Sequence, residues 1–268
     1  MTNQAGSKRI NDIFFGPLER PALQWLAKRM PAWVTPDTLT LFGLFGTILI
    51  FTSYALTGFN RHFLWLASLG YIINWFGDSL DGTLARYRHI ERPRYGFMLD
   101  HLVDCFGSVL IVLGMGLSPF VNFTVASLTL ITYLMVSILV YIVTITNGVF
   151  RISSGKIGPT ELRVFLILAN TVAFFYAKPL FTVAFGSFTI FDVLLAVMGI
   201  GLLVLYAVNS ITESAKLAAL EPATAIIAQR KAEARQAKIE ALARKKARRQ
   251  SSKRTHTSSV TATSHRSS

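Results

Sequence analysis

Six long apolar stretches, separated by short polar breaks, occupy most of the first 212 residues. They cover approximately residues 38–58, 63–84, 97–119, 122–149, 162–183 and 189–212. The hydrocarbon core of a bilayer is about 30 Å thick, so a helix of roughly 20 apolar residues can cross it. A helix also satisfies all of its own backbone hydrogen bonds in lipid. The pattern therefore predicts an all-α integral membrane protein with six transmembrane helices.

The segment before the first stretch has a different pattern. Between residues 13 and 30, apolar residues such as Leu23 and Leu26 alternate with basic residues such as Arg20 and Lys28. This spacing predicts an amphipathic helix that lies in the membrane interface, with its basic residues near anionic headgroups. A plain cytosolic cap is the alternative interpretation.

The segment after the sixth stretch is polar and basic. Residues 221–250 are rich in Ala, Lys, Arg and Glu, which favour a helix, and residues 244–249 form a polybasic run. Residues 251–268 are rich in Ser and Thr and are expected to be disordered. The predicted divisions are an N-terminal arm, a membrane domain and a basic tail, at residues 1–33, 34–213 and 214–268.

Composition and charge narrow the class of protein. Only 15% of the residues are charged, against roughly 25% in a soluble domain, and the single Cys105 excludes an internal disulfide. The net charge is +13, but 13 of the 27 Lys and Arg residues follow residue 213. A polybasic run beside a membrane more often meets anionic lipid than nucleic acid, and it also fixes topology. We therefore expect membrane lipids as a partner and no nucleic acid.

Basic residues in the loops predict the orientation of the six helices. On one side lie the basic residues Lys8, Arg9, Arg20, Lys28, Arg29, Arg86, Arg88, Arg92, Arg94, Arg151, Lys156 and Arg163. The other side has only Arg61 and Lys178. Because cytoplasmic loops carry the excess of Lys and Arg, both termini are expected in the cytoplasm.

Four of the 14 acidic residues fall in one window of 27 residues at the end of the second stretch and the start of the third: Asp78, Asp81, Asp100 and Asp104. The first two are three residues apart and the last two are four apart, so each pair shares a helix face. The two helices are consecutive and antiparallel, so the acidic faces can meet at the cytoplasmic end. Four such carboxylates either share protons or bind hard cations such as Mg²⁺ or Mn²⁺. Two such ions would balance the charge, and a two-ion site typically handles phosphoryl groups.

Small residues and one arginine lie between the acidic pairs. Gly82 has no side chain, so a ligand can approach Asp81 closely, and Gly96 stands one turn before the second pair. Ala85 also leaves space, and Arg86 offers a bidentate fork suited to phosphate. These four residues are therefore candidates for contact with a phosphate-bearing ligand.

The string reads Asp78-x2-Asp81-Gly82-x2-Ala85-Arg86-x9-Gly96-x3-Asp100-x3-Asp104. It closely resembles the signature of the CDP-alcohol phosphatidyltransferase family, with one residue more than usual between Arg86 and Gly96. Val34-Thr35-Pro36-Asp37-Thr38-Leu39-Thr40 resembles the entry to the first span in that family, with Asp37 in place of the usual Asn. Residues 155–161 resemble a Gly-Pro-Thr-Glu segment of some members. The resemblance covers about residues 20–213.

This resemblance implies a phospholipid-synthesising enzyme that displaces CMP from a CDP-linked molecule by an alcohol. It implies CDP-diacylglycerol as donor and a small polar alcohol or alcohol phosphate as acceptor. A six-helix core, often dimeric, would place the site on the cytoplasmic face of a bacterial inner membrane. Divalent ions, Mg²⁺ or Mn²⁺, would be held by Asp78, Asp81, Asp100 and Asp104, and Asp104 would also be the general base. The nucleotide-contacting residues would be Gly82, Ala85 and Gly96, with Arg86 either near the nucleotide or anchoring the motif.

Several alternatives stay open. An aminoalcohol phosphotransferase would use CDP-choline or CDP-ethanolamine, with diacylglycerol as the acceptor. A membrane prenyltransferase and a cation transporter are more remote, because the four carboxylates cluster at one end of two neighbouring helices. The acceptor itself is not identified by the sequence. Four basic residues could hold a phosphate group of the acceptor: Arg94, Arg151, Lys156 and Arg163. Each of them is equally explained as a cytoplasmic-side residue that fixes the membrane topology.

Overall fold

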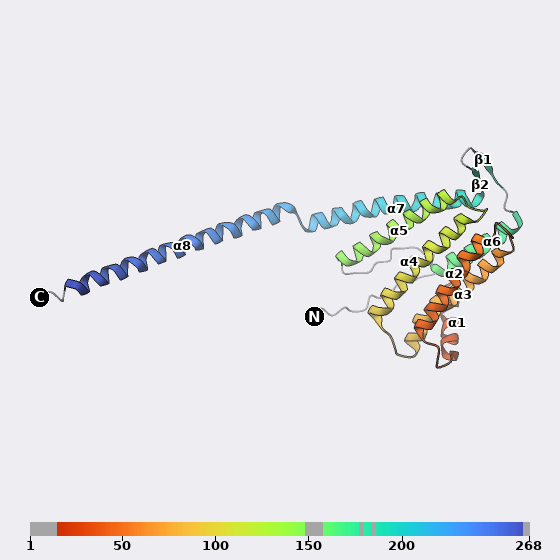
Figure 1. Ribbon diagram of the computed structural model, residues 1–268, viewed down its shortest axis with the longest axis horizontal. Coiled ribbons are helices and arrows are strands. Elements are labelled where there is room, and N and C mark those ends of the chain that lie inside the picture. Colours follow the sequence, from red (N-terminus) through yellow and green to blue (C-terminus); the bar gives the residue numbers. More distant parts are fainter. Residues whose placement is uncertain (1–14, 148–157, 177–178, 184–185, 265–268) are drawn as a thin grey trace. The chain divides into compact units, whose positions relative to one another are not determined.

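The structure, a computed structural model, describes residues 15–147, 158–176, 179–183 and 186–264. Contacts divide the chain into two compact units, Met1–Asn209 and Ser210–Ser268. The elements are α1 (Gly16–Arg29), α2 (Pro36–Leu56), α3 (Phe63–Tyr87), α4 (Pro93–Leu117), α5 (Phe123–Asn147), α6 (Pro159–Tyr176), β1 (Phe181–Val183), β2 (Gly186–Phe188), α7 (Ile190–Leu220) and α8 (Ala223–Ser264) (Figure 1).

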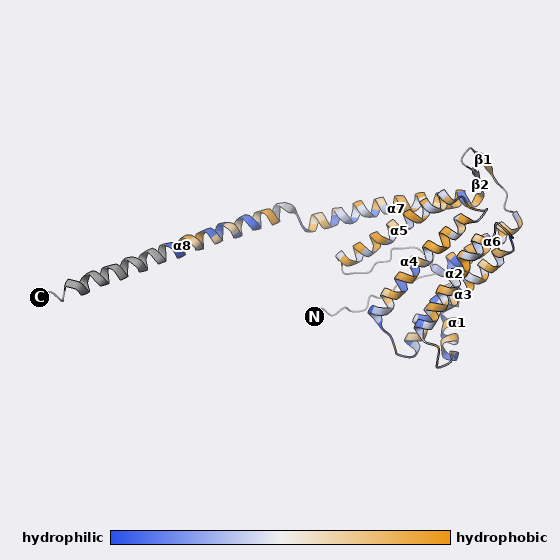
Figure 2. Cartoon of the chain, in the orientation of Figure 1, coloured by the Kyte–Doolittle hydropathy of each residue, from blue (hydrophilic) through white to orange (hydrophobic). Residues whose placement is uncertain are grey.

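Each predicted apolar stretch corresponds to one helix, from α2 to α7. Four of these helices, α2, α4, α5 and α7, are long and apolar enough to cross a membrane. Figure 2 shows hydrophobic residues along them and hydrophilic residues where α4 begins. The helices α3 and α6 are less apolar because they carry polar residues such as Asp78 on α3 and Arg163 on α6. A largely helical membrane protein is confirmed, and the crossing by all six helices stays a prediction.

The predicted helix over residues 162–183 is wrong at its end. The helix α6 stops at Tyr176, and β1 pairs with β2 as an antiparallel hairpin. Pro179 has no backbone N–H with which to continue a helix, which favours a break near this position. Phe181 and Phe188 are paired across the hairpin, and their rings stack with centroids 5.2 Å apart. The described residues are therefore not wholly helical.

The second unit contains the end of α7 and the helix α8. A helix after residue 221 was expected and is confirmed, but disorder from residue 251 is wrong, because α8 continues to Ser264. Extending an existing helix needs no new nucleus, so a Ser/Thr-rich end can continue a helix that Ala, Lys and Glu have started.

Glycines allow α2 and α3 to pack with their backbones almost in contact. A Cβ atom on Gly77 of α3 would lie 2.4 Å from the Gly43 nitrogen and 2.4 Å from the Leu39 carbonyl oxygen of α2. A Cβ on Gly46 would lie 2.6 Å from the Asn74 nitrogen. Side chains at these positions cannot be accommodated without moving a backbone. The glycines therefore set the distance between α2, which begins at the acidic site, and α3, which ends there.

The N-terminal helix α1 packs on α3. Leu23 and Ala27 of α1 are buried in one cluster with Leu80 and Leu84 of α3. Burying such side chains is worth about 1.5–3 kcal/mol each for the large ones. The expected amphipathic helix is thus present over Gly16–Arg29, and part of its apolar face contacts protein. Its position in the membrane interface stays a prediction.

Arg88 directly follows the last residue of α3 and holds the connection between α1 and α2. Its Nη2 donates to the carbonyl oxygens of Met30, at 3.0 Å, and Pro31, at 2.8 Å. Its Nη1 donates to the Val34 carbonyl oxygen at 2.5 Å. These carbonyls follow the end of α1 and have no helical partner, so the guanidinium group satisfies them and fixes α1 against α3.

Candidate functional site

Three carboxylates from two helices converge. Asp78 of α3 and Asp100 and Asp104 of α4 each offer one oxygen atom, and these atoms lie within 4.8 Å of one another. The two α4 residues share a face because they are one turn apart, as the sequence predicted. The helix α2 packs against both α3 and α4, and Asp78 of α3 supplies the third carboxylate.

The donor set fits a divalent cation. Carboxylate oxygens are the ligands that Mg²⁺ and Mn²⁺ prefer, and three within 4.8 Å would repel one another without a cation. These three residues are therefore positioned to bind a metal ion.

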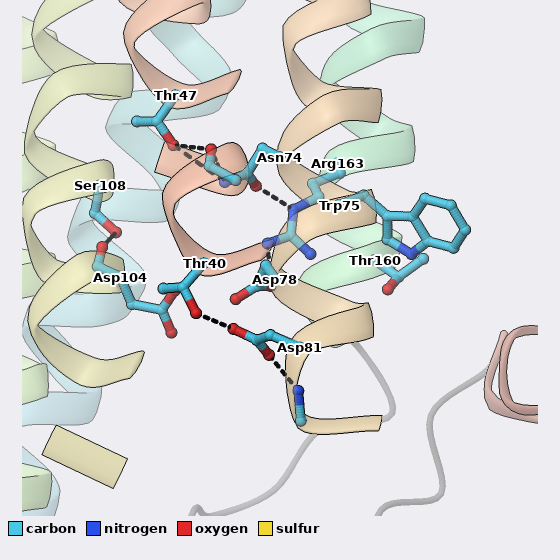
Figure 3. Close-up of polar contacts among 12 residues, drawn as sticks. Thr40, Thr47, Asn74, Trp75, Asp78, Asp81, Asp104, Ser108, Thr160 and Arg163 are labelled. Carbon is cyan, nitrogen blue, oxygen red and sulfur yellow. Dashed lines mark hydrogen bonds and ion pairs between the residues drawn. The ribbon is translucent and has the colours of Figure 1, made fainter. Parts of the chain in front are cut away.

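The fourth predicted ligand, Asp81, lies outside this group of three. Its Oδ2 accepts a hydrogen bond from the Thr40 hydroxyl at 2.6 Å, and its Oδ1 accepts one from the Gly82 backbone N–H at 2.5 Å (Figure 3). The two donors fix the carboxylate at the last turns of α3. Each oxygen keeps a further lone pair, so a metal-binding role for Asp81 stays a prediction.

The start of α2 explains how Thr40 is placed. Thr35 caps the helix: its hydroxyl accepts from the Thr38 N–H at 3.2 Å, and the Thr38 hydroxyl accepts from the Thr35 N–H at 2.9 Å. Pro36 occupies the first helical turn, where its missing N–H has no cost. The segment that resembled a family motif therefore starts a helix at a fixed residue and directs Thr40 toward Asp81.

Arg163 of α6 reaches the metal-binding group. Its Nη2 donates to Asp78 Oδ2 at 2.5 Å, and its Nε donates to Asn74 Oδ1 at 2.8 Å. Asn74 in turn donates to the Thr47 hydroxyl at 3.0 Å and to the Gly43 carbonyl oxygen at 3.2 Å (Figure 3). This chain of bonds joins α2, α3 and α6 behind the carboxylates. Arg163, predicted as either an acceptor-phosphate cation or a topology residue, is thus the partner of a predicted ligand.

A cavity of about 790 Å³, a size typical of small-ligand sites, is lined by Asp78, Asp81 and Asp100, whereas Asp104 is not part of its lining. The predicted nucleotide-contacting residues Gly82, Ala85, Arg86 and Gly96 all line it. A Cβ on Gly82 would lie 3.3 Å from Arg86 Nη1, whereas a Cβ on Gly96 would meet no atom within 4 Å. Both glycines therefore keep space open on the cavity side, and their contact with a nucleotide stays a prediction.

The helix α1 contributes a wall of the same cavity. Its Glu19 lines the cavity and accepts two hydrogen bonds at Oε1, from the Trp75 indole Nε1 at 2.8 Å and from the Thr160 hydroxyl at 2.8 Å. Sequence analysis did not single out Glu19. The partners are 56 and 141 residues away in the chain, so no local pattern could reveal them.

An ion pair joins the starts of α2 and α4 at the cavity. Arg92 donates to the carboxylate of Asp37, and both residues line the cavity. This hydrogen bond raises the pKa of Arg92, which stays protonated. Asp37, the departure from the family's usual Asn, therefore has a cationic partner on the neighbouring loop.

Among the other predicted acceptor cations, the structure describes only Arg94. It is exposed and is not part of the cavity lining. Arg151 and Lys156 lie outside the described residues.

Comparison with known proteins places this site in a family. The family model for CDP-alcohol phosphatidyltransferase matches residues 33–220. Cholinephosphotransferase 1 of Homo sapiens is 26% identical over 204 residues, which cover 70% of this chain and 46% of that protein. Cholinephosphotransferase 1 of Gallus gallus is 28% identical over 171 residues, covering 59% of this chain and 49% of that protein.

A bacterial relative matches a shorter region. The phosphatidylinositol phosphate synthase of Cutibacterium acnes is 38% identical over 88 residues, which cover 32% of this chain and 39% of that protein. The chain thus spans about half the length, or less, of these curated relatives. The family model covers well over half of the chain itself, including every residue of the acidic string. The chain therefore belongs to the CDP-alcohol phosphatidyltransferase family.

Proposed function

We propose that this protein transfers a substituted phosphate group from a CDP-linked alcohol to the hydroxyl of a second alcohol, releasing CMP. The observation that carries the proposal is the convergence of Asp78, Asp100 and Asp104 beside the 790 Å³ cavity in a member of this family. The attack breaks a P–O bond of the CDP diphosphate and CMP leaves as an anion, so a site whose carboxylates can hold cations beside the diphosphate is suited to this transfer.

We propose Mg²⁺ or Mn²⁺, as two ions, for this site. Asp78, Asp100 and Asp104 would hold them, with Asp81 as the fourth ligand. The bound ions would neutralise the negative charge that develops on the diphosphate as CMP leaves.

The protein side chains would divide the remaining work. Asp104 would accept the proton of the attacking hydroxyl group, which makes the oxygen a better nucleophile. Gly82, Ala85, Arg86 and Gly96 would surround the cytidine nucleotide. Nη1 of Arg163 is buried and has no hydrogen-bond partner among the described residues, so it is available to an anionic phosphate oxygen.

We propose CDP-diacylglycerol and a small polar alcohol or alcohol phosphate as the first substrate pair. The second candidate is CDP-choline or CDP-ethanolamine with diacylglycerol. The second candidate is favoured by the relatives named cholinephosphotransferase, which align with up to 72% of this chain, whereas the phosphatidylinositol phosphate synthase aligns with 32%.

We propose that α2 to α7 all cross the membrane and that the site faces the cytoplasm with both termini on that side. The carboxylates lie where α3 ends and α4 begins, next to the connection that carries Arg88 and Arg92, as the excess of basic residues in cytoplasmic loops predicts. A bacterial inner membrane and a homodimer stay predictions, since the relatives come from vertebrates as well as from a bacterium.

Release of CMP by the purified full-length protein tests the function. We expect release from CDP-diacylglycerol or CDP-choline with the matching acceptor in the presence of Mg²⁺ or Mn²⁺, and loss of release when a chelator is added. A panel of acceptor alcohols identifies the substrate. Absence of CMP from every pair, with the protein folded and monodisperse, would refute the proposed reaction.

Thr40→Val is expected to lower kcat/KM for CMP release by about tenfold, because the isosteric change removes the hydroxyl donor that orients Asp81. A hydrogen bond to a charged group is worth about 1.5–3 kcal/mol. Thr52→Val is the matched control, since the Thr52 hydroxyl bonds only to carbonyls of its own helix. Equal activities of the two variants would remove the role assigned to Thr40.

A further inference from the structure

The carboxylate of Glu19 is held in place by neutral donors. Both printed bonds, from Trp75 Nε1 and from Thr160 Oγ1, end on the same oxygen, Oε1. Oε2 accepts no hydrogen bond from the residues that the structure describes, and none of their Lys or Arg groups lies within 4.0 Å of Glu19. The side chain is half-buried and lines the cavity. Glu19 therefore presents a positioned negative charge that has no cationic partner among the described residues.

The two donors lie on the helices that carry the metal-binding group and its arginine. Trp75 stands three residues before Asp78 on α3, and Thr160 stands three residues before Arg163 on α6. Figure 3 draws Trp75 and Thr160 beside the Arg163–Asp78 pair. Glu19 is thus anchored to both helices, on the side of the cavity formed by α1.

Four arginines line the same cavity, namely Arg20, Arg86, Arg92 and Arg163, and two of them have carboxylate partners. Arg163 is bonded to Asp78 and Asn74, and Arg92 is paired with Asp37. A neutral glutamine would anchor α1 to α3 and α6 equally well, because its carbonyl oxygen accepts the same two bonds. Anchoring therefore does not account for the charge. A negative charge in a partly enclosed cavity attracts a cationic ligand and repels an anionic one.

We propose that Glu19 is a specificity-determining residue that recognises the ammonium group of an amino alcohol. The inference rests on the proposed function, whose substrates include an alcohol that is cationic, neutral or anionic. The ammonium group enters either as part of a CDP-linked amino alcohol or as a free amino alcohol that attacks CDP-diacylglycerol. In both cases Oε2 of Glu19 binds the cation while the hydroxyl or phosphate end of the same molecule reaches the carboxylates.

Glu19→Gln separates charge from anchoring. For the purified variant we expect KM for CDP-choline, CDP-ethanolamine or free ethanolamine to rise about tenfold, because a charged contact is lost. The kcat for the same substrates is expected to stay within about threefold of wild type. CMP release from CDP-diacylglycerol with inositol or glycerol phosphate is expected not to fall. Thr160→Ala is the matched control: it removes one anchoring bond and keeps the charge, and its KM is expected to change less than threefold.

Three results would overturn the proposal. The first is an unchanged KM of Glu19→Gln for every ammonium substrate. The second is an equal rise in the KM of Glu19→Gln for cationic and for neutral alcohols. The third is a wild-type protein that is active only with inositol or phosphate-bearing alcohols. In each case CMP release by the wild-type protein still supports the proposed reaction.

Equilibrium binding of CDP-choline and of CDP supplies a readout that needs no turnover. Tighter binding of CDP-choline than of CDP in wild type, lost in Glu19→Gln, supports recognition of the ammonium group even if no CMP is released. Equal binding of the two ligands by wild type counts against it. The fold of each variant is checked by its unfolding temperature.

Discussion

Changing Asp104 to Asn is expected to lower CMP release by at least about a hundredfold while the protein still binds its CDP-linked substrate, as loss of a general base predicts. Asn has nearly the same shape as Asp but cannot take the proton of the attacking hydroxyl group. The fold should tolerate the change, because the Ser108 hydroxyl bonds to the backbone oxygen of Asp104 and not to its carboxylate. Turnover and binding of the CDP-linked substrate are measured on the same preparation.

Asp81→Asn provides the comparison that isolates the base. We expect this variant to lose binding of the divalent ion and of the nucleotide together, because Asp81 is assigned to the metal alone and takes no part in proton transfer. If Asp104→Asn loses binding to the same extent, Asp104 is a ligand like the others and has no separate role as a base. If Asp104→Asn keeps both binding and turnover, the assignment of the base is wrong.

The acidic centre was predictable because its signal is local. Asp100 and Asp104 share a face of α4 through helical spacing. Asp78 lies on the preceding helix of the chain, α3, which a short loop joins to α4. The topology of two consecutive antiparallel helices then leaves little freedom, and the three carboxylate groups meet as expected. The residues that support them were not predictable in this way. Thr40 and Arg163 reach the site from helices 41 and 85 residues away from their partners.

The fold shows the same division. Apolar stretches longer than a bilayer is thick identified the helices from α2 to α7, since burial in lipid leaves few alternatives. Hydropathy does not tell a helix from a short strand, so β1 falls inside the predicted helix over residues 162–183, whereas β2 lies in the predicted break before residue 189. Similarly, the composition after residue 250 indicated disorder, whereas α8 continues from a strong helix-forming segment to Ser264. Composition thus indicated the environment of these segments better than their conformation.

Changing Gly77 to Ala is expected to be the most damaging single-methyl substitution in the α2–α3 contact. The new Cβ would lie 2.4 Å from the Gly43 nitrogen and 2.4 Å from the Leu39 carbonyl oxygen, which are backbone atoms that cannot rotate away. The helices must separate, at a cost of about 1–3 kcal/mol or more. A fall in the unfolding temperature of about 5 °C or more follows for a unit of this size.

The same separation acts directly on the site, because Gly77 precedes Asp78. Moving α3 away from α2 lengthens the bond from Thr40 to Asp81, so CMP release is expected to fall at least about tenfold, the effect of losing one charge-assisted bond. Gly201→Ala on α7 is the control, since a Cβ there meets no atom within 4 Å. Gly96→Ala is equally free of clashes but lines the cavity, so it should leave the unfolding temperature unchanged and raise KM for the CDP-linked substrate. If Gly77→Ala and Gly201→Ala have equal unfolding temperatures, α2 and α3 adapt to the new methyl group without separating. The glycine contact would then not be what fixes the relative positions of the carboxylates.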